Sequence, residues 1–280
     1  MLKLERLLGG LAFPEGPRWH GGVLYFSDMH DYKVLTVDLS GKTSVVCEVA
    51  QSPSGLGWLP DGRMLVVSMN DRRVLRLERD GLKLHADIST LATFTCNDMV
   101  VDGEGRAYVG NFGFDLIAGG KPKPAEIVLV EPSGAARVAA SNLDFPNGSV
   151  ITPDSRTLIV GESFGRRLTA FDINADGSLT NRRLWADIKP AVPDGIALDA
   201  ENAVWVASPI TKELLRVFEG GRIAERIACD SQAIACALGG ADRKTLFALL
   251  ADSINPDECR AKRSARIEVG QVEVPGAGWP

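Results

Sequence analysis

Cysteine and histidine are scarce in this chain, with five and three among 280 residues. The cysteines form no CxxC pair and no even framework, which argues against a cysteine-based metal site or a disulfide scaffold. Cys47, Cys96, Cys229 and Cys236 lie in apolar, strand-like segments, where we expect buried thiols. Cys259 lies in a polar loop with nothing nearby to lower its pKa, so we do not expect a nucleophile there.

Long apolar runs, basic clusters and a recognisable leader are missing as well. No apolar run approaches the roughly 20 residues of a membrane span, so we expect no membrane association. A net charge of −5 without a basic cluster argues against nucleic acid as a partner. Residues 1–6 show no apolar segment followed by a small-residue cleavage site, and we expect a cytoplasmic protein. Nothing in the sequence indicates an obligate protein partner.

Helical periodicity is nearly absent, whereas short β-branched runs between Gly, Asp and Pro recur along the whole chain. Six repeats of about four strands predict an all-β, six-bladed β-propeller that forms a single domain over residues 1–280. A β-sandwich or two smaller β-domains would not explain one position that recurs six times. Residues 2–5 and 266–269 both read as strands, and we expect an N-terminal strand to complete the C-terminal blade and close the ring.

The repeats align on one position that varies mainly between oxygen-bearing side chains and recurs every 39 to 50 residues, as propeller blades do. The residues of this column are Glu15, Ser54, Asn97, Asn147, Asp194 and Ala233. Asp-Gly and Asn-Gly are common turn pairs, but turn chemistry does not place four oxygens at one register position.

Four column residues, Glu15, Asn97, Asn147 and Asp194, supply two carboxylates and two amides and predict one divalent metal ion. An all-oxygen set favours Ca²⁺, with Mg²⁺, Mn²⁺, Zn²⁺ and Fe²⁺ as alternatives. If the column residues lie at the start of the innermost strands, the connections between the second and third strands of each blade form the walls of a pocket above the column. Two of these connections, near 111–125 and 252–265, are long. The expected substrate-binding residues are the apolar Met29, Met69, Phe112, Phe114, Phe164 and Ile210 and the polar Ser54, Thr95 and Asn111.

Several motifs in order resemble one family, the senescence-marker-protein, gluconolactonase and luciferin-regenerating-enzyme-like lactonases. They are Phe13-Pro14-Glu15-Gly16-Pro17, Asn97-Asp98, Gly110-Asn111-Phe112, Pro146-Asn147-Gly148, Pro193-Asp194-Gly195 and the segment 270–278. The resemblance covers essentially the whole chain and implies a six-bladed propeller with Glu15, Asn147 and Asp194 as principal metal ligands. Asn97 would be a ligand or a substrate contact. Diisopropyl-fluorophosphatase-type enzymes share a similar column, so phosphoester chemistry is a related alternative.

One departure from the family bears on the substrate. Sugar lactonases generally carry Arg two residues before the column Asn, where this chain has Thr95. An apolar wall leaves sugar hydroxyls without partners, so we expect a less polar lactone or ester as the small-molecule substrate. A sugar lactone stays open as the alternative, because Asn70, Ser54, Asn111 and Thr211 offer hydrogen bonds.

The expected reaction is hydrolysis, with the ion polarising the carbonyl and Asp194 acting as general base toward water. His30 is the alternative base, although we expect a polar surface residue there. His20 and His85 are placed away from the pocket. Two other functions fit the same column: a non-catalytic, metal-stabilised small-molecule-binding or regulatory propeller, and a strictosidine-synthase-like propeller that joins substrates without a metal.

Overall fold

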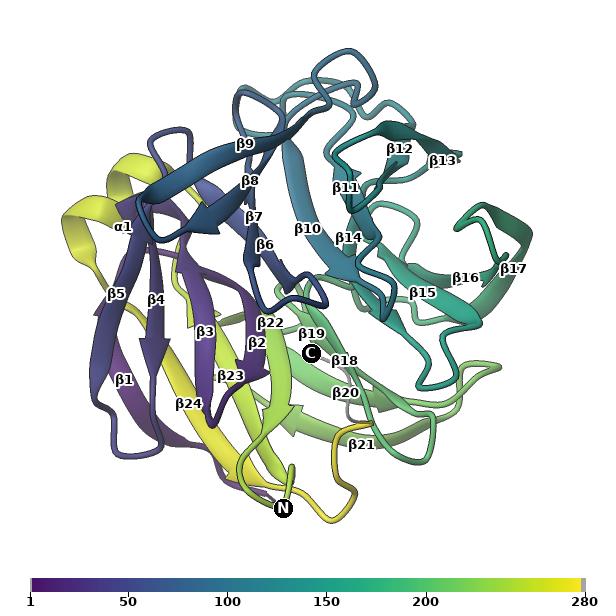
Figure 1. Cartoon of the computed structure of the whole chain (residues 1–280). Coiled ribbons are helices and arrows are strands. Elements are labelled where there is room, and N and C mark those ends of the chain that lie inside the picture. The colour runs from purple at the N-terminus through teal and green to yellow at the C-terminus, as the bar shows by residue number, and fades with distance from the viewer. Residues whose placement is uncertain (1, 278–280) are drawn as a thin grey trace.

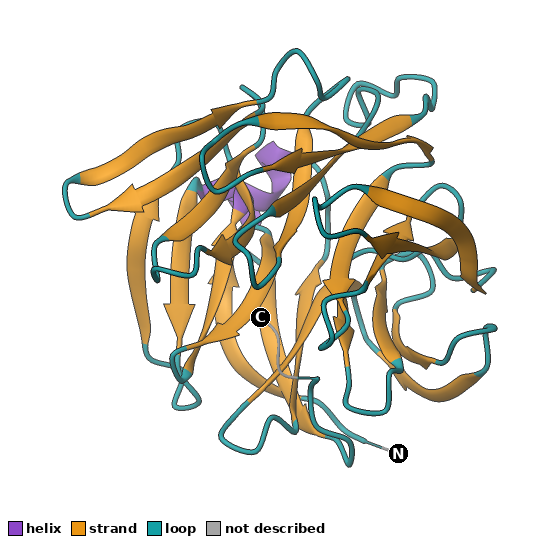
Figure 2. Ribbon diagram, turned by 45° about the vertical axis from the view of Figure 1, so that its right-hand side comes forward, coloured by secondary structure: helices purple, strands orange, loops and turns teal. Residues whose placement is uncertain are grey.

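The computed structural model describes residues 2–277 and contains six four-stranded antiparallel sheets arranged as the blades of a propeller (Figures 1 and 2). The first three blades are β2 (Pro14–His20), β3 (Val23–Asp28), β4 (Lys33–Val37) and β5 (Thr43–Glu48); β6 (Pro53–Trp58), β7 (Met64–Ser68), β8 (Arg73–Glu78) and β9 (Gly81–Asp87); and β10 (Cys96–Val101), β11 (Ala107–Asn111), β12 (Ala125–Val130) and β13 (Ala136–Leu143). The next two are β14 (Pro146–Ile151), β15 (Thr157–Glu162), β16 (Arg167–Ile173) and β17 (Leu179–Asp187); and β18 (Ile196–Leu198), β19 (Val204–Ser208), β20 (Glu213–Val217) and β21 (Ile223–Ala228). The predicted six-bladed, all-β class is confirmed.

The sixth blade closes the ring with strands from both ends of the chain. Strands β22 (Gln232–Gly239), β23 (Thr245–Ala251) and β24 (Ala265–Gln271) come from the C-terminal part, and β1 (Glu5–Leu11) is its outer strand. Glu5 pairs with Val269 and Leu11 with Ala265. The predicted closure is confirmed, but the closing strand is Glu5–Leu11 rather than residues 2–5. Gly9 and Gly10 have low strand propensity, so the sequence does not indicate a strand there. The side chains of Leu2 and Leu4 pack against the blade.

Two short helices interrupt the connections on the face that carries the pocket. A 3-10 turn, η1 (Met29–Asp31), follows β3, and α1 (Pro256–Lys262) lies in the connection between β23 and β24 that the sequence shows only as a long loop. Pro256 in the first turn and Asn255 as N-cap start α1. The two helices lie next to each other. No helix within residues 2–277 is long and apolar enough to cross a membrane.

A local irregularity lies at the column position in five of the inner strands. The pairing register shifts between Glu15 and Arg18, Pro53 and Leu56, Cys96 and Met99, Pro146 and Ser149, and Ala233 and Ala235. A bulge adds a residue to one strand and changes the direction of its side chain. In the fifth blade, Asp194 and Gly195 precede β18. The backbone N–H of Asp194 donates to Ala207 O and that of Gly195 donates to Ile234 O, both at 2.9 Å.

Glycine follows four of the six column residues, at places where adjacent inner strands touch backbone to backbone. A Cβ on Gly148 would lie 2.5 Å from the carbonyl oxygen of Asp194 and 2.6 Å from the nitrogen of Ile196. The backbone N–H of Gly148 donates to that same oxygen at 3.2 Å. The repeated glycine therefore fixes the spacing between neighbouring column residues.

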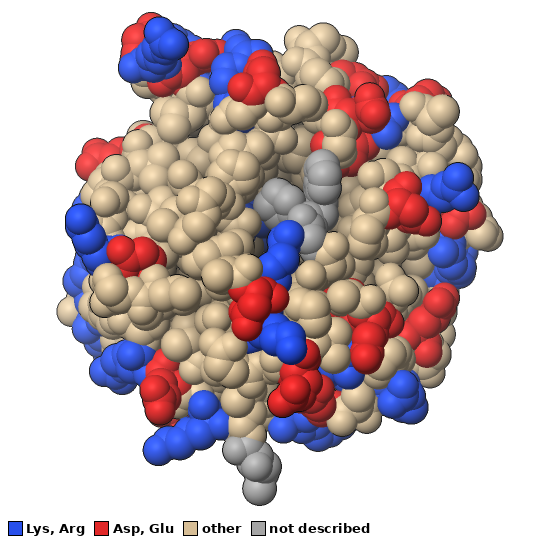
Figure 3. Space-filling model, turned by 60° about the horizontal axis from the view of Figure 1, so that its bottom comes forward, with Lys and Arg blue, Asp and Glu red and all other residues tan. Residues whose placement is uncertain are grey.

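Apolar side chains fill the spaces between blades, with the rings of Trp205, Tyr108, Phe26 and Phe247 fully buried. The C-terminal segment crosses the end of the channel opposite to α1, where Ala277 N donates to Leu198 O at 2.9 Å and Gly276 forms a bridge with Asp199. The surface turned forward in Figure 3 carries basic and acidic side chains intermixed with uncharged ones.

Candidate metal centre and substrate pocket

The four column residues meet on the wall of one cavity of about 560 Å³. Glu15, Asn97 and Asn147 are the second residues of β2, β10 and β14, and Asp194 precedes β18. The cavity also contacts η1, α1 and the segment between β11 and β12. It is lined by Phe13, Glu15, Met29, His30, Tyr32, Ser52, Met69, Asn70, Phe94, Thr95, Asn97, Phe112, residues 115–118, Phe145, Asn147, Asp194, Ile254, Pro256 and Arg260.

Two carboxyl groups lie close together in this cavity, and both have raised pKa values. Burial is the main cause of the raised pKa of Glu15, and the charges of Asp194 and Asp98 add to it. Burial likewise raises the pKa of Asp194 to about 8, with the amide of Asn147 acting in the opposite direction. Without a compensating cation, the pocket therefore disfavours ionisation of both acids.

The polar atoms of the column have few protein partners. Asp194 Oδ1 and Asn97 Nδ2 are buried and have no hydrogen-bond partner in the described chain. Asn147 Nδ2 donates to Ser163 Oγ at 3.2 Å, and that hydroxyl donates to Pro193 O at 2.7 Å. This bond uses one N–H of Asn147, and the amide oxygen is available as a ligand.

These donors fit a hard divalent cation. Two carboxylates would balance its charge, and the unpartnered oxygen of Asp194 would gain a ligand. No group of three His, Cys, Asp or Glu residues suited to a metal occurs within residues 2–277, so amide oxygens would have to complete the set. Such an all-oxygen set suits Ca²⁺ better than a metal that prefers sulfur or imidazole.

A third carboxylate lies directly behind the column. Asp98 follows Asn97, and its buried side chain pairs with the buried guanidinium of Arg18 at 2.9 Å. The sequence reading missed this pair. Arg18 follows Glu15 by three residues and Asp98 follows Asn97 by one, but nothing in the sequence shows that the two motifs meet.

The cavity wall is largely aromatic and aliphatic. The ring of Phe112 stacks on that of Phe145, with centroids 4.5 Å apart and an interplanar angle of 24°. Met29, Met69 and Thr95, expected from the sequence as substrate contacts, also line the cavity. Phe94 and Phe145 line it too and were missed, although each lies within three residues of a column residue.

Five other expected substrate contacts do not line the cavity. Ser54 is fully buried, and Asn111 accepts from Gly113 N at 2.9 Å and donates to Glu126 O at 3.0 Å, which fixes the start of the following loop. Phe114 is buried behind the wall, with its ring 5.9 Å from that of Phe145. Phe164 and Ile210 are 47% and 67% exposed.

His30 lies in the cavity rather than on the open surface expected for it. Its ring lies 5.0 Å from that of Phe13. Burial, together with the positive charge of Arg260, lowers the pKa of His30 to about 4, so the imidazole is neutral near pH 7. His20 instead stacks on Trp58 with centroids 4.1 Å apart, and His85 lies beside the carbonyl oxygen of Glu131. Asn70, expected from the sequence as a hydrogen-bonding group for a sugar lactone, lines the cavity, and Tyr32 and Arg260 are further polar lining residues that the sequence did not assign.

Comparison with known proteins agrees with this architecture. The SMP-30/gluconolactonase/LRE-like region matches residues 13–251. Regucalcin of Danio rerio is 25% identical over 58% of this chain and 56% of its own length, so the match spans little more than half of that relative. Pentonolactonase XacC of Haloferax volcanii is 25% identical over 75% of this chain and 68% of its own. A solved regucalcin from Agrobacterium tumefaciens, described as a calcium-binding protein, shares the fold with a TM-score of 0.81 and 19% identity over 99% of this chain and 95% of its own. The chain therefore belongs to the SMP-30/gluconolactonase/LRE-like family.

Proposed function

We propose that this protein is a divalent-metal-dependent hydrolase that opens a lactone or ester of a comparatively apolar small molecule. The observation that carries the proposal is the meeting of two carboxylates and two amides inside a cavity with an aromatic wall. Lactone hydrolysis is supported by membership of this family and by similarity to a relative named as a pentonolactonase.

Glu15, Asn97, Asn147 and Asp194 would hold the ion, and Ca²⁺ is the metal that this donor set favours. The alternatives remain Mg²⁺, Mn²⁺, Zn²⁺ and Fe²⁺. Four protein ligands leave room for water or substrate in a sphere of about six to eight oxygens. When bound, the ion would polarise the carbonyl of the substrate and stabilise the oxyanion.

The chain's own residues would position the reactants and transfer the proton. Asp194 would accept a proton from the attacking water through the carboxylate oxygen that does not bind the ion. His30 is the alternative base, because its imidazole is neutral near pH 7 and lies in the same cavity. Phe112 and Phe145 would cover the apolar part of the substrate and keep water from that side.

The aromatic wall favours an apolar substrate over a sugar lactone. Each sugar hydroxyl that entered against Phe94, Phe112 or Phe145 would lose water without gaining a partner. Ser52 and Asn70 line the cavity and keep a sugar lactone as the second candidate. A non-catalytic, metal-stabilised binding propeller is the third. A cytoplasmic location stays a prediction from the sequence.

A lactone panel assayed with and without chelator tests the proposal. We expect hydrolysis of aryl and alkyl lactones that is lost with chelator, returns with a divalent ion and is lost in Asp194→Asn. Gluconolactone, included in the same panel, measures the preference against sugars. If the metal-loaded protein binds lactones but hydrolyses none of them or of a matching ester panel, the binding propeller is the correct function.

A further inference from the structure

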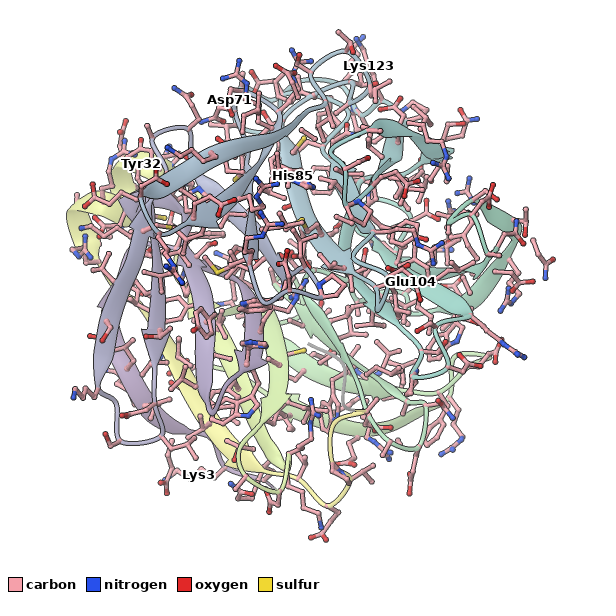
Figure 4. All side chains as sticks on the ribbon, in the orientation of Figure 1. Lys3, Tyr32, Asp71, His85, Glu104 and Lys123 are labelled. Atoms are coloured by element: carbon pink, nitrogen blue, oxygen red, sulfur yellow. The ribbon has the colours of Figure 1, made fainter. Side chains whose placement is uncertain are left out.

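A cationic side chain lines the same cavity as the column. Arg260 on α1 is the one Lys or Arg among the described residues that line it. Its Nη1 donates to the hydroxyl of Tyr32 at 3.3 Å. Tyr32 lines the cavity too, and Figure 4 shows it beside α1. A fixed positive charge therefore lies on the wall of an otherwise largely apolar pocket.

The helix that carries Arg260 is held by its N-cap, by its buried face and by contacts at its C-terminal end. Asn255 caps it by accepting from two first-turn N–H groups at 3.0 and 3.2 Å, and the side chain of Cys259, in the middle of the helix, is buried. At its end, Arg263 pairs with Asp31 at 2.9 Å and donates to Gly10 O at 2.9 Å. Because α1 is capped at its start and bound to Asp31 and Gly10 at its end, its side chains have a defined position relative to the pocket.

Arg260 and its neighbours are able to receive an anion. The hydroxyl of Tyr32 accepts from Arg260 and donates to no residue within 2–277, so its hydrogen is free for a ligand. The carboxylate that now pairs with Arg260, that of Asp257, has a side chain 91% exposed, and such surface pairs contribute little. A ligand carboxylate could therefore replace it. Asp115, the acidic lining residue of the neighbouring segment, is occupied in part by the N–H of Ala118 at 2.9 Å.

We propose that Arg260 and Tyr32 form an anion-binding subsite, and that the substrate is an apolar lactone or ester carrying a carboxylate away from the bond that is hydrolysed. The substrate class rests on the proposed hydrolase function, whereas the subsite itself does not. A guanidinium binds a carboxylate through two N–H groups, a stronger interaction than a neutral hydrogen bond. A neutral apolar substrate would remove water from Arg260 without replacing it.

Binding of a probe tests the subsite without turnover. We would titrate metal-loaded protein with 1-naphthaleneacetate and with its neutral amide, 1-naphthaleneacetamide, by calorimetry. Wild type should bind the carboxylate at least about tenfold more tightly than the amide, a ratio that corresponds to about 1.4 kcal/mol. Arg260→Gln should reduce this ratio to near one, and Arg260→Lys should restore it in part.

Lys262→Gln is the matched control, because Lys262 lies on the same helix, pairs with Glu258 at 3.4 Å and does not line the cavity. Its ratio should equal that of wild type, and circular dichroism should show that all variants are folded. The subsite is refuted if wild type has no preference for the carboxylate. It is equally refuted if Arg260→Gln keeps the preference, as it would if the carboxylate binds the metal instead.

Turnover then tests the substrate class. An aryl lactone bearing a remote carboxylate should have a higher kcat/KM than its carboxamide analogue, mainly through KM. Arg260→Gln should lower kcat/KM for the carboxylate lactone far more than for the carboxamide, and so abolish that advantage. If wild type hydrolyses both lactones equally, the substrate class is wrong. If it hydrolyses neither while the probe result holds, the hydrolase function fails and the subsite stands.

Discussion

Arg18 binds both carboxylate oxygens of Asp98 through one guanidinium nitrogen, at 2.9 and 3.0 Å. The same nitrogen donates to the carbonyl oxygen of Met99 at 2.6 Å. Asp98 follows a candidate metal ligand in sequence, and its negative charge contributes to the raised pKa values of Glu15 and Asp194. Arg18 thus compensates a carboxylate that would otherwise add unpaired charge behind the column.

Removal of Arg18 should therefore destabilise the protein strongly. Breaking a buried ion pair by removing one partner typically costs about 3–5 kcal/mol, because the remaining charge is uncompensated. We expect Arg18→Met to lower the free energy of unfolding, measured by urea denaturation, by that order. Adding Asp98→Asn should recover much of the loss, because no charge is then left unpaired. A double variant no more stable than Arg18→Met would show that the pairing is not the reason.

Stability of the metal-free protein should fall as pH rises. The carboxyl of Asp194 stays protonated in the folded state up to about pH 8, whereas the unfolded chain releases that proton near its ordinary pKa of 3.8. Over this range the folded state binds more protons than the unfolded state, so the free energy of unfolding decreases with pH. Glu15, whose pKa is also raised, acts in the same direction. Urea denaturation in chelator at a series of pH values measures the slope.

A divalent ion should reverse this trend at neutral and alkaline pH. Binding releases the protons of both acids and stabilises the folded state by about 2.7 kcal/mol at a concentration of 100 Kd. Glu15→Gln combined with Asp194→Asn should remove both the pH slope and the response to Ca²⁺. A metal-free protein whose stability is flat from pH 4 to 8 would contradict the raised pKa values.

Substitution of Gly148 should displace Asp194. In Gly148→Ala the new methyl group would lie 2.5 Å from a backbone oxygen, too close for any real contact, so the strands must separate. We expect reduced Ca²⁺ affinity by calorimetry together with a lower thermal midpoint. Gly9→Ala is the control, because its added Cβ would meet its nearest neighbour at 3.8 Å. Unchanged Ca²⁺ binding in Gly148→Ala would mean that this spacing does not matter.

The aromatic wall should determine the preference for apolar lactones. Phe112→Ala removes the ring that stacks on Phe145 and should lower kcat/KM for an aryl lactone by ~10-fold, a typical contribution of one apolar contact. Hydrolysis of γ-butyrolactone, which has no apolar substituent, should change much less. Ile210→Ala is the control, because Ile210 is 67% exposed and does not line the cavity. Equal effects of the two substitutions would place the substrate elsewhere.

The fold was predictable because its information is local and repeated. Each blade repeats turn residues and alternating strands, and the Pro-Glu-Gly, Pro-Asn-Gly and Pro-Asp-Gly motifs recur at intervals typical of blades. Glu15, Asn97, Asn147 and Asp194 could be aligned because each occupies the same place in its repeat. The exact closing strand escaped the sequence, because Gly9-Gly10 has low strand propensity.

Contacts between blades were decided only by the tertiary structure. The pairing of Arg18 with Asp98 joins residues 80 positions apart, and Arg260 meets Tyr32 across 228 positions. No periodic pattern encodes such pairs, because each depends on how non-neighbouring segments meet when the ring closes. The sequence by itself thus determined the propeller and the candidate column, through repetition. Closure of the ring decided which loop side chains line the pocket, because that depends on the geometry of several blades at once.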